Sequence, residues 1–254
     1  MANADAVQRD GDVVHRPAPP CAPALHAFLR AIRAEGFAGV PEPLSLDRDR
    51  ETLGYLPGDV ALPPFPAWAM SEEALTSVAR LVRRYHDTAR TVGVPGDAPW
   101  PSELSDPRGG TMLCHNDICV ENTVFRHGKA VALLDFDLAA PGRPLWDLAH
   151  VSRFWAPMLD PESAAIAYPA GLDPARRLRM LADAYGLPLG DRVALVDAIR
   201  AADEAARAFV AARVQRGERA FLEAFTQQGG WVRWDRKITW FEATSNRLIG
   251  ELLA

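Results

Sequence analysis

The chain has 254 residues, of which 48% are hydrophobic and 24% are charged, and its formal net charge is −5. This composition is typical of an ordinary globular protein, and the length allows one large domain or two lobes. The lack of a basic block argues against a nucleic-acid partner, and no apolar run is long enough to span a membrane. The first ten residues lack the apolar core of a signal peptide, so a cytoplasmic location is expected.

The first segment is predicted to contain a short strand and a helix. Residues 1–12 are polar and small, and we expect them to be frayed. Residues 12–16 predict a strand, which the prolines from Pro17 onward end. Residues 24–35 carry apolar side chains at helical spacing, and Gly36 ends the predicted helix.

A hairpin and a proline-rich connection follow. Residues 43–46 and 51–56 flank the charged turn 47–50, which predicts two paired strands. Residues 56–58 break this pattern. Residues 59–69 are rich in proline and lead away from the hairpin.

The next element is predicted to be a long helix that begins after Ser71. Serine is a favourable N-cap, and two glutamates follow it in the first turn. Apolar side chains at helical spacing continue to His86, which we interpret as a hydrogen-bonded core residue and not as a catalyst. Residues 93–110 are rich in proline and glycine and predict a loop, which enters a short apolar strand at residues 111–114.

The stretch from residue 113 to residue 137 contains the polar residues most suggestive of chemistry. His115, Asp117 and Asn122 lie in one loop, and a strand at residues 131–134, expected to be fully buried, ends in Asp135. An aspartate that can accept a hydroxyl proton, followed by an amide oxygen and a second carboxylate, suits magnesium-assisted phosphoryl transfer. The alternative is a buried hairpin with incidental polar residues.

These motifs resemble the catalytic loop and metal-binding strand of aminoglycoside phosphotransferases and choline kinases, which share a protein-kinase-like fold. The resemblance implies Asp117 as the catalytic base and Asn122 and Asp135 as ligands of Mg²⁺. His115 would complete the catalytic loop by holding its geometry through hydrogen bonds. Asp137 stands where protein kinases have glycine and is a candidate for a second metal or substrate contact. Asp147 is similar to the family aspartate that supports the catalytic loop.

The same resemblance implies a nucleotide-binding lobe at residues 1–58, with a helical lobe at residues 59–254. Arg16 stands where the family has a lysine that holds the phosphates, and the following helix offers no acidic partner in its first turns. Backbone groups near Tyr55 and Leu56 would meet the adenine edge. The family's glycine-containing hairpin lacks the room to form, so this lobe is expected to be shortened.

Cysteine and lysine are both scarce. Cys21, Cys114 and Cys119 are an odd set, which predicts reduced thiols. Cys114 and Cys119 flank His115 and Asp117, an arrangement that could suggest a zinc site. Closed zinc sites usually pair two separated ligand clusters, and the sequence shows no second cluster. We therefore interpret both cysteines as packing residues. Only two lysines occur, Lys129 and Lys237, against many arginines.

The remaining chain predicts helices at residues 174–185, at 191–225 with a division near Gly217, and at 234–253. Three tryptophans in and before the last helix are expected in the core: Trp231, Trp234 and Trp240. By resemblance, acidic side chains on these helices would bind the acceptor. The candidates are Asp203, Glu204, Glu218 and Glu223.

We therefore expect an α+β, protein-kinase-like, two-lobed fold with a small, shortened N-terminal sheet lobe and a larger helical lobe. The expected activity is Mg²⁺-dependent transfer of the γ-phosphoryl group of ATP or GTP to a hydroxyl of a small molecule. The acceptor would be an aminoglycoside-like antibiotic or an amino alcohol. One alternative is a non-catalytic module that binds a nucleotide or small molecule, and a weaker one is a hydrolase that uses the same metal site on water.

Overall fold

The N-terminal part of the chain forms an antiparallel sheet with a helix packed beside it. A computed structural model describes residues 7–254. The strands lie in the order β1-β2-β4-β3. Their bounds are β1 (Gln8–Asp10), β2 (Val13–Pro17), β3 (Pro43–Asp47) and β4 (Arg50–Gly54). The helix α1 (Ala22–Ala34) connects β2 to β3 and buries the apolar stripe that the sequence predicts.

The expectation of a frayed segment at residues 1–12 is wrong for Gln8–Asp10. These residues form β1, which pairs with β2 around a turn at Gly11, where φ is +57°. All three side chains of β1 are exposed, so backbone pairing with β2 is the strand's main support, and no apolar pattern marks it in the sequence. Residues 1–6 lie outside the described part of the chain.

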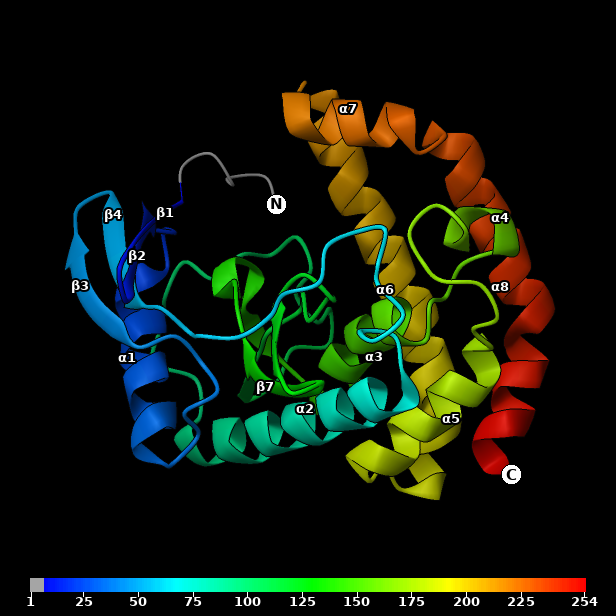
Figure 1. Ribbon diagram of the computed structural model, residues 1–254, viewed down its shortest axis with the longest axis horizontal. Helices are drawn as coiled ribbons and strands as arrows, with labels where there is room; N and C mark the ends of the chain where they lie inside the picture. Colours follow the sequence, from blue (N-terminus) through cyan, green and yellow to red (C-terminus); the bar gives the residue numbers. More distant parts are fainter. Residues whose placement is uncertain (1–6) are drawn as a thin grey trace.

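The hairpin predicted at residues 43–56 is confirmed, with the turn between Asp47 and Arg50. The chain then crosses as an extended connection from the sheet to the helical part (Figure 1). Along the way, the N–H of Asp59 donates to the carbonyl of Phe125, and the N–H of Phe125 donates back, each at 2.8 Å. This pair of hydrogen bonds attaches the connection to the second half of the molecule.

The second half begins with α2 (Glu72–Val92), whose N-cap Ser71 accepts a hydrogen bond from the N–H of Ala74 at 3.1 Å. Two small antiparallel pairs, β5–β8 and β6–β7, then frame the loop that carries Asp117. Their bounds are β5 (Met112–Cys114), β6 (Thr123–Arg126), β7 (Lys129–Leu133) and β8 (Ala140–Gly142). A 3₁₀ turn, η2 (Phe136–Leu138), separates β7 from β8.

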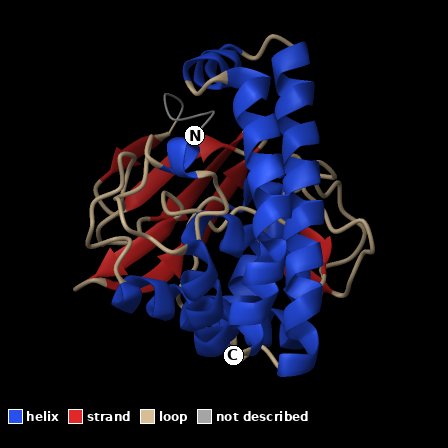
Figure 2. Cartoon of the chain, turned by 90° about the vertical axis from the view of Figure 1, so that its right-hand side faces the viewer, coloured by secondary structure: helices blue, strands red, loops and turns tan. Residues whose placement is uncertain are grey.

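Helices make up the rest of the chain. Their bounds are α3 (Pro144–Trp155), α4 (Pro161–Ala164), α5 (Pro174–Tyr185), α6 (Leu189–Gln215), α7 (Arg219–Gln227) and α8 (Gly230–Leu253). α5 packs between α2 and α8, and α6 packs against α3 and α8. The long helices α6 and α8 run side by side at the end of the molecule opposite the first sheet (Figures 1 and 2). In residues 7–254, every helix is too short or too polar to cross a bilayer.

Two expectations about burial need correction. The strand predicted at residues 131–134 begins earlier, at Lys129, and only Ala132 and Leu133 are buried, because the tip of the β6–β7 hairpin reaches solvent. Trp231, Trp234 and Trp240 are half-buried and not enclosed in the core, and Trp240 packs against its edge. The buried apolar residues of α8 are instead Phe241, Leu248 and Leu252, on a face that packs against α5 and α6.

Candidate functional site

The carboxylate of Asp147 fixes the start of the loop that follows β5 and carries Asp117. This side chain, in the first turn of α3, accepts the backbone N–H groups of His115 and Asn116, both at 2.8 Å. It also pairs with the Nε2 atom of His86 at 3.1 Å, while Nδ1 of His86 contacts the hydroxyl of Tyr185 at 2.8 Å. His86 and Asp147 are fully buried. The predicted core role of His86 and the supporting role of Asp147 both match these contacts.

A second set of hydrogen bonds joins the loop to the end of β7. His115 donates from Nε2 to the carbonyl of Leu134 at 2.8 Å, and Asn116 donates from its side chain to the carbonyl of Leu138 at 2.9 Å. His115 is buried, and burial lowers the pKa of its imidazole, so the neutral ring is favoured. With Nε2 fixed as the donor, His115 holds the loop beside Asp135 and has no free proton to exchange.

Asp117 is half-buried at the centre of this loop. The side-chain amide of Asn122 donates to the carboxylate of Asp117 at 3.0 Å and to its backbone carbonyl at 2.9 Å. Burial, followed by the negative charge of Asp135, raises the pKa of Asp117 to about 8. A carboxylate with a pKa near neutrality can accept a hydroxyl proton and release it again.

Asn122, Asp135 and Asp137 have side-chain oxygens that suit a cation, and Asp135 lies near enough to Asp117 for its negative charge to act there. Because Asn122 donates with its amide nitrogen, its Oδ1 atom is turned away from Asp117, and this oxygen accepts no hydrogen bond within residues 7–254. Asp135 has a left-handed backbone (φ +62°), and its carboxylate is about one-third exposed. A non-glycine residue in this conformation is often found at a functional site.

These donors fit a magnesium ion in chemical type. Carboxylate and amide oxygens are the hard ligands that Mg²⁺ takes, and the remaining positions are usually filled by water and phosphate oxygens. Within the described residues, no three His, Cys, Asp or Glu side chains are grouped so as to hold a metal by themselves. The amide oxygen of Asn122 would supplement the carboxylate of Asp135 in a magnesium site here. Cys114 and Cys119 are buried, free thiols, which agrees with their interpretation as packing residues.

Arg16 reaches from β2 into the same place. Its guanidinium donates to Asp135 at 2.9 Å and to Asp137 at 2.6 Å, and Nε donates to Glu51 on β4 at 2.7 Å. Although burial lowers it, the pKa of Arg16 is raised overall by the charges of Asp137, Glu51 and Asp135. Arg16 is thus a permanent positive charge that touches both carboxylates of the proposed metal site.

Sequence reasoning missed the acidic partner of Arg16. Glu51 is 1% exposed and also binds Nε2 of His26, on α1, at 2.6 Å. The sequence showed no acid in the first turns of the helix, where the family has one; here the helix supplies a histidine and the neighbouring strand supplies the acid. Arg16 and Glu51 face each other directly in the β2–β4 register. Arg16 and Glu51 carry opposite charges on two predicted strands, and this could have indicated the ion pair. The pairing of these two strands with each other was not predicted, so the ion pair was missed.

The backbone that would meet an adenine edge follows β4 directly. The N–H of Tyr55 donates to the carbonyl of Asp12 at 2.8 Å, and the N–H of Gly54 donates to the carbonyl of Glu42 at 2.8 Å. Within residues 7–254 the N–H of Leu56 makes no hydrogen bond. The guanidinium of Arg9 lies 3.5 Å from the ring centroid of Tyr55.

The acidic candidates for the acceptor site do not come together. Glu218 pairs with Arg213 and Arg216, and Glu223 pairs with Arg219 on the surface. Glu204 is exposed. Asp203 is buried between two cations, Arg153 and Lys237. The four residues thus form no shared acidic surface for a cationic acceptor.

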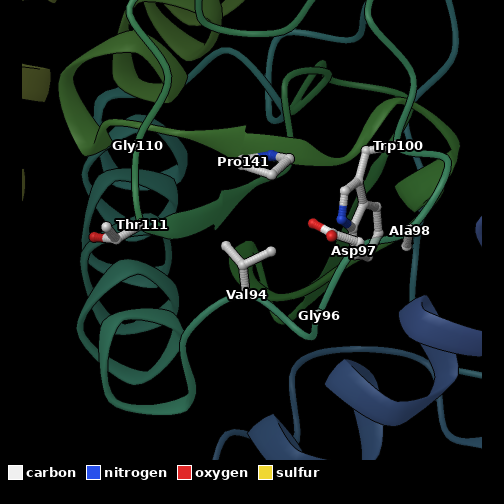
Figure 3. Close-up of a pocket in the computed structure, with 8 residues that line it drawn as sticks. All are labelled: Val94, Gly96, Asp97, Ala98, Trp100, Gly110, Thr111 and Pro141. Carbon is white, nitrogen blue, oxygen red and sulfur yellow. The ribbon is translucent and has the colours of Figure 1, made fainter.

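Two surface cavities lie away from this loop. One, of about 390 Å³, is lined by residues from the loop after α2 and by Pro141, with the Trp100 indole facing it (Figure 3). The other, of about 620 Å³, lies beside the connection between the sheet and the helices, at Gly58, Asp59, Val60, Trp68 and Gly128. Neither is lined by Asp117 or its neighbours, so neither marks the site of the proposed chemistry.

Comparison with known proteins gives a consistent picture. A sequence model of the phosphotransferase enzyme family matches residues 97–181, which include the loop, β7 and α3. A trifolitoxin immunity protein from Rhizobium leguminosarum bv. trifolii is 32% identical over 200 residues, covering 75% of this chain and 74% of that protein.

Solved structures share the fold at low sequence identity. A choline/ethanolamine kinase family protein from Mesorhizobium loti superimposes with a TM-score of 0.59 at 17% identity, covering 97% of this chain and 88% of the other. The ternary complex of APH(2″)-IIa with streptomycin and ATP gives a TM-score of 0.51 at 12% identity, covering 95% and 91%. These neighbours confirm the protein-kinase-like fold expected from the sequence.

Proposed function

The chain belongs to the phosphotransferase enzyme family, and on that basis we propose that it transfers the γ-phosphoryl group of ATP or GTP to a hydroxyl of a small molecule. The observation that supports this most is the arrangement of one loop and one strand end: Asp117, hydrogen-bonded to Asn122, stands beside Asp135. A base and two hard oxygen ligands are the parts that such a transfer requires.

In this proposal each residue has a distinct task. Asp117 orients the acceptor hydroxyl and takes its proton as the oxygen attacks the γ-phosphorus. Asn122 and Asp135 would hold Mg²⁺, which neutralises charge on the phosphates when it is bound. Arg16 contributes a fixed positive charge next to the same phosphates, and His115 keeps the loop in place. Catalysis would consist mainly of positioning and charge stabilisation, with little covalent work by the protein.

The division of labour follows the two parts of the chain. We assign nucleotide binding to residues 1–58, with the backbone of Tyr55 and Leu56 toward the base, and acceptor binding to residues 59–254. A cytoplasmic location is part of the proposal, because ATP and magnesium are available there.

The name of the relative suggests a biological role. A protein 32% identical to this chain is a trifolitoxin immunity protein. We therefore propose that the acceptor is a hydroxylated toxin or antibiotic and that its phosphorylation protects the cell. This role fits the same site, because protection by phosphorylation needs only a hydroxyl on the toxin and a base to activate it.

Phosphoryl transfer from labelled ATP and GTP, with magnesium, across a panel of hydroxylated antibiotics and amino alcohols tests the function. We expect a phosphorylated product from the wild-type protein. Asp117→Asn should lower turnover by roughly two to four powers of ten, the range expected for a general base. A variant that turns over at the wild-type rate would refute the assignment of Asp117.

A second candidate function is a non-catalytic module that protects by binding its ligand. The ion pairs of Arg16 with Asp135 and Asp137 favour it, because they engage the carboxylates that magnesium would need. Thermal unfolding with ATP and magnesium, compared with ATP and EDTA, separates the candidates. A magnesium-dependent rise in Tm supports a competent nucleotide site. Equal Tm values, without any phosphorylated product, support the binding module.

A further inference from the structure

Three helices bring a buried ion cluster together beside the catalytic loop. Arg153 on α3 and Lys237 on α8 both donate to the same atom, Oδ1 of Asp203 on α6, and the Lys237–Asp203 distance is 2.5 Å. The three side chains are each less than 10% exposed. The cluster joins residues that are 50 and 34 positions apart in the chain.

The cluster lies close to Asp117. Trp155, two residues after Arg153, donates from its indole to the carbonyl of Ile118 at 3.0 Å, which attaches the last turn of α3 to the catalytic loop. The positive charge of Arg153 also acts on Asp117, where it partly offsets the effect of burial on the pKa. The cluster is therefore joined to the catalytic loop through the last turn of α3.

The cluster carries more positive charge than its one carboxylate can balance. Within residues 7–254, Asp203 is the only acid that pairs with Arg153 or Lys237. Arg233 acts on Lys237 as a further positive charge, and it pairs with no acid in the described residues. Within residues 7–254, Glu121 forms no ion pair with these cations, whereas the charge of Asp160 acts on Arg233. An uncompensated charge in a largely buried place is costly unless a ligand or water supplies the missing partner.

Hydrogen-bond donors in the cluster also remain unused. Lys237 uses one of its three ammonium protons, and its ammonium lies 5.1 Å from the ring centroid of Trp234. Arg153 uses Nε for Asp203 and Nη1 for His150, at 3.3 Å, while Nη2 has no partner in residues 7–254. A guanidinium and an ammonium with free donors suit an oxyanion.

Composition gives independent support for a special role of Lys237. Of 28 basic residues, only Lys129 and Lys237 are lysines. Lys129 stands on an exposed hairpin with 65% of its side chain accessible, whereas only 8% of the Lys237 side chain is accessible. In a chain that otherwise uses arginine, a buried lysine indicates a place where a compact point charge is needed next to a guanidinium.

We propose that Arg153 and Lys237 bind an oxyanion group of the acceptor, so that the acceptor is a hydroxylated acid and not a polycation. This inference rests on the proposed phosphotransferase function and narrows its substrate class. The acceptor's carboxylate or phosphate would sit on the two cations, and its hydroxyl would reach Asp117. Asp203 then acts as a positioning residue, because it holds both cations without meeting the substrate.

Direct binding of a simple oxyanion tests this site without knowledge of the acceptor. Calorimetry with inorganic phosphate and with malonate should show binding to the wild-type protein and to Lys129→Gln, the matched exposed control. Lys237→Gln should weaken binding at least tenfold, and Lys237→Arg should restore most of it because it returns the charge. The phosphate and malonate arms distinguish a phosphate group from a carboxylate.

Equal oxyanion affinity in Lys237→Gln and in the wild type would overturn the inference, as would an equal loss of binding in Lys129→Gln. The transfer reaction supplies a second readout, with glycerate and glycolate compared against choline and ethanolamine. We expect KM for the hydroxy acids to rise tenfold or more in Lys237→Gln, with kcat changed little. Transfer only to the cationic acceptors, unaltered in Lys237→Gln, would refute the acceptor class and leave the proposed function standing. If no acceptor is phosphorylated, the proposed function fails. Even in that case, oxyanion binding that is lost in Lys237→Gln would support an oxyanion site at Arg153 and Lys237.

Discussion

Arg16 and Asp137 are two residues at which this chain departs from the pattern of protein kinases, which have a lysine and a glycine at these places. In the structure the two residues contact each other at 2.6 Å. The planar guanidinium reaches Glu51, Asp135 and Asp137 at once, which a single ammonium could not do with the same geometry. The two departures therefore belong together.

We expect Arg16→Lys and Asp137→Gly to be energetically coupled. Each single variant should lower the free energy of unfolding by about 1–3 kcal/mol, because each leaves a partly buried charge with fewer partners. The double variant should cost less than the sum of the two, with a coupling of roughly 0.5–3 kcal/mol. Urea denaturation of the four proteins measures the cycle. If the effects of the two single variants add up to that of the double variant, the Arg16–Asp137 contact contributes nothing to the free energy of unfolding.

The residue scale also shows why part of the site was predictable. Asp117, Asn122 and Asp135 are close in sequence, so one loop and one strand end bring them together whatever the distant chain does. The partners of Arg16 depend on the pairing of β2 with β4, and on a helix that places His26 against Glu51. Sequence spacing carries no information on such pairing. The Arg153–Asp203–Lys237 cluster was missed for the same reason, since three separate helices create it.

At the scale of elements, α3 is the support on which the catalytic loop rests. Its residue Asp147 accepts two backbone N–H groups of the loop and also pairs with His86. Although burial opposes it, the pKa of Asp147 is lowered by the hydrogen bond and charge of His86 and by the contacts with His115. The ionised carboxylate is therefore the form that holds the loop.

We expect Asp147→Asn to lower the free energy of unfolding by about 2–4 kcal/mol, because an amide has one acceptor oxygen and would turn its NH₂ group toward a backbone N–H. Turnover should fall as well, since the loop loses its support. Asp191→Asn, an exposed acid in the first turn of α6, is the matched control and should change stability by less than about 0.5 kcal/mol. If chemical denaturation shows that Asp147→Asn lowers the free energy of unfolding as little as Asp191→Asn does, the carboxylate of Asp147 is not needed to hold the loop.

The same helix contains a histidine that should make the protein sensitive to acid. His150 is fully buried, and burial, followed by the charge of Arg153, lowers its pKa to about 3. Its folded pKa thus lies below the ordinary value of 6.5, so the unfolded chain binds more protons between these two values. The contribution of His150 to the free energy of unfolding should therefore be fully present above pH 6.5 and should be lost progressively as the pH drops toward 3.

The contribution of His150 should amount to about 3 kcal/mol between pH 6.5 and pH 4, at 1.36 kcal/mol per pKa unit. His150→Gln removes the titration, so the free energy of unfolding should depend less on pH over this range. Denaturation in urea at pH 7, 6, 5 and 4 compares the two proteins. His127→Gln, in the turn between β6 and β7, serves as the control and should behave as the wild type does. Parallel pH curves for His150→Gln and the wild type would contradict the assignment.

Helices were predicted better than strands, and the reason is physical. α2 and α5 each have an N-cap residue, an apolar stripe and a terminal glycine. All three signals lie within a short stretch of sequence, so they can be recognised without knowledge of the tertiary structure. β1 has no buried side chain and forms only because β2 offers its edge. The tryptophans of α8 were assigned to the core because aromatic stripes on helices mostly lie there. The face of a helix that meets its neighbours depends on tertiary packing, however, and here it leaves them half-buried.

For the molecule as a whole, the connection at Gly58 determines how the sheet and the helical part meet. The backbone here has φ +150°, and a Cβ atom at this position would lie 2.5 Å from the carbonyl oxygen of Phe125 and 2.5 Å from a methyl carbon of Val124. The next residue, Asp59, pairs with Phe125 through two hydrogen bonds. The close approach of the connection to β6 therefore requires glycine.

We expect Gly58→Ala to lower the free energy of unfolding by about 2–4 kcal/mol, because the backbone of β6 cannot move aside without breaking the Asp59–Phe125 pair. If the connection also sets the distance between Arg16 and Asp135, KM for the nucleotide should rise in the same variant. Gly36→Ala is the control, since Gly36 has φ +88° with open space around its Cβ position and should cost only about 1 kcal/mol, the cost of the backbone conformation. Denaturation and nucleotide KM, measured on both variants, separate the two effects. A Gly58→Ala protein that matches Gly36→Ala in stability and keeps the wild-type KM would show that the two parts of the molecule meet independently of this contact.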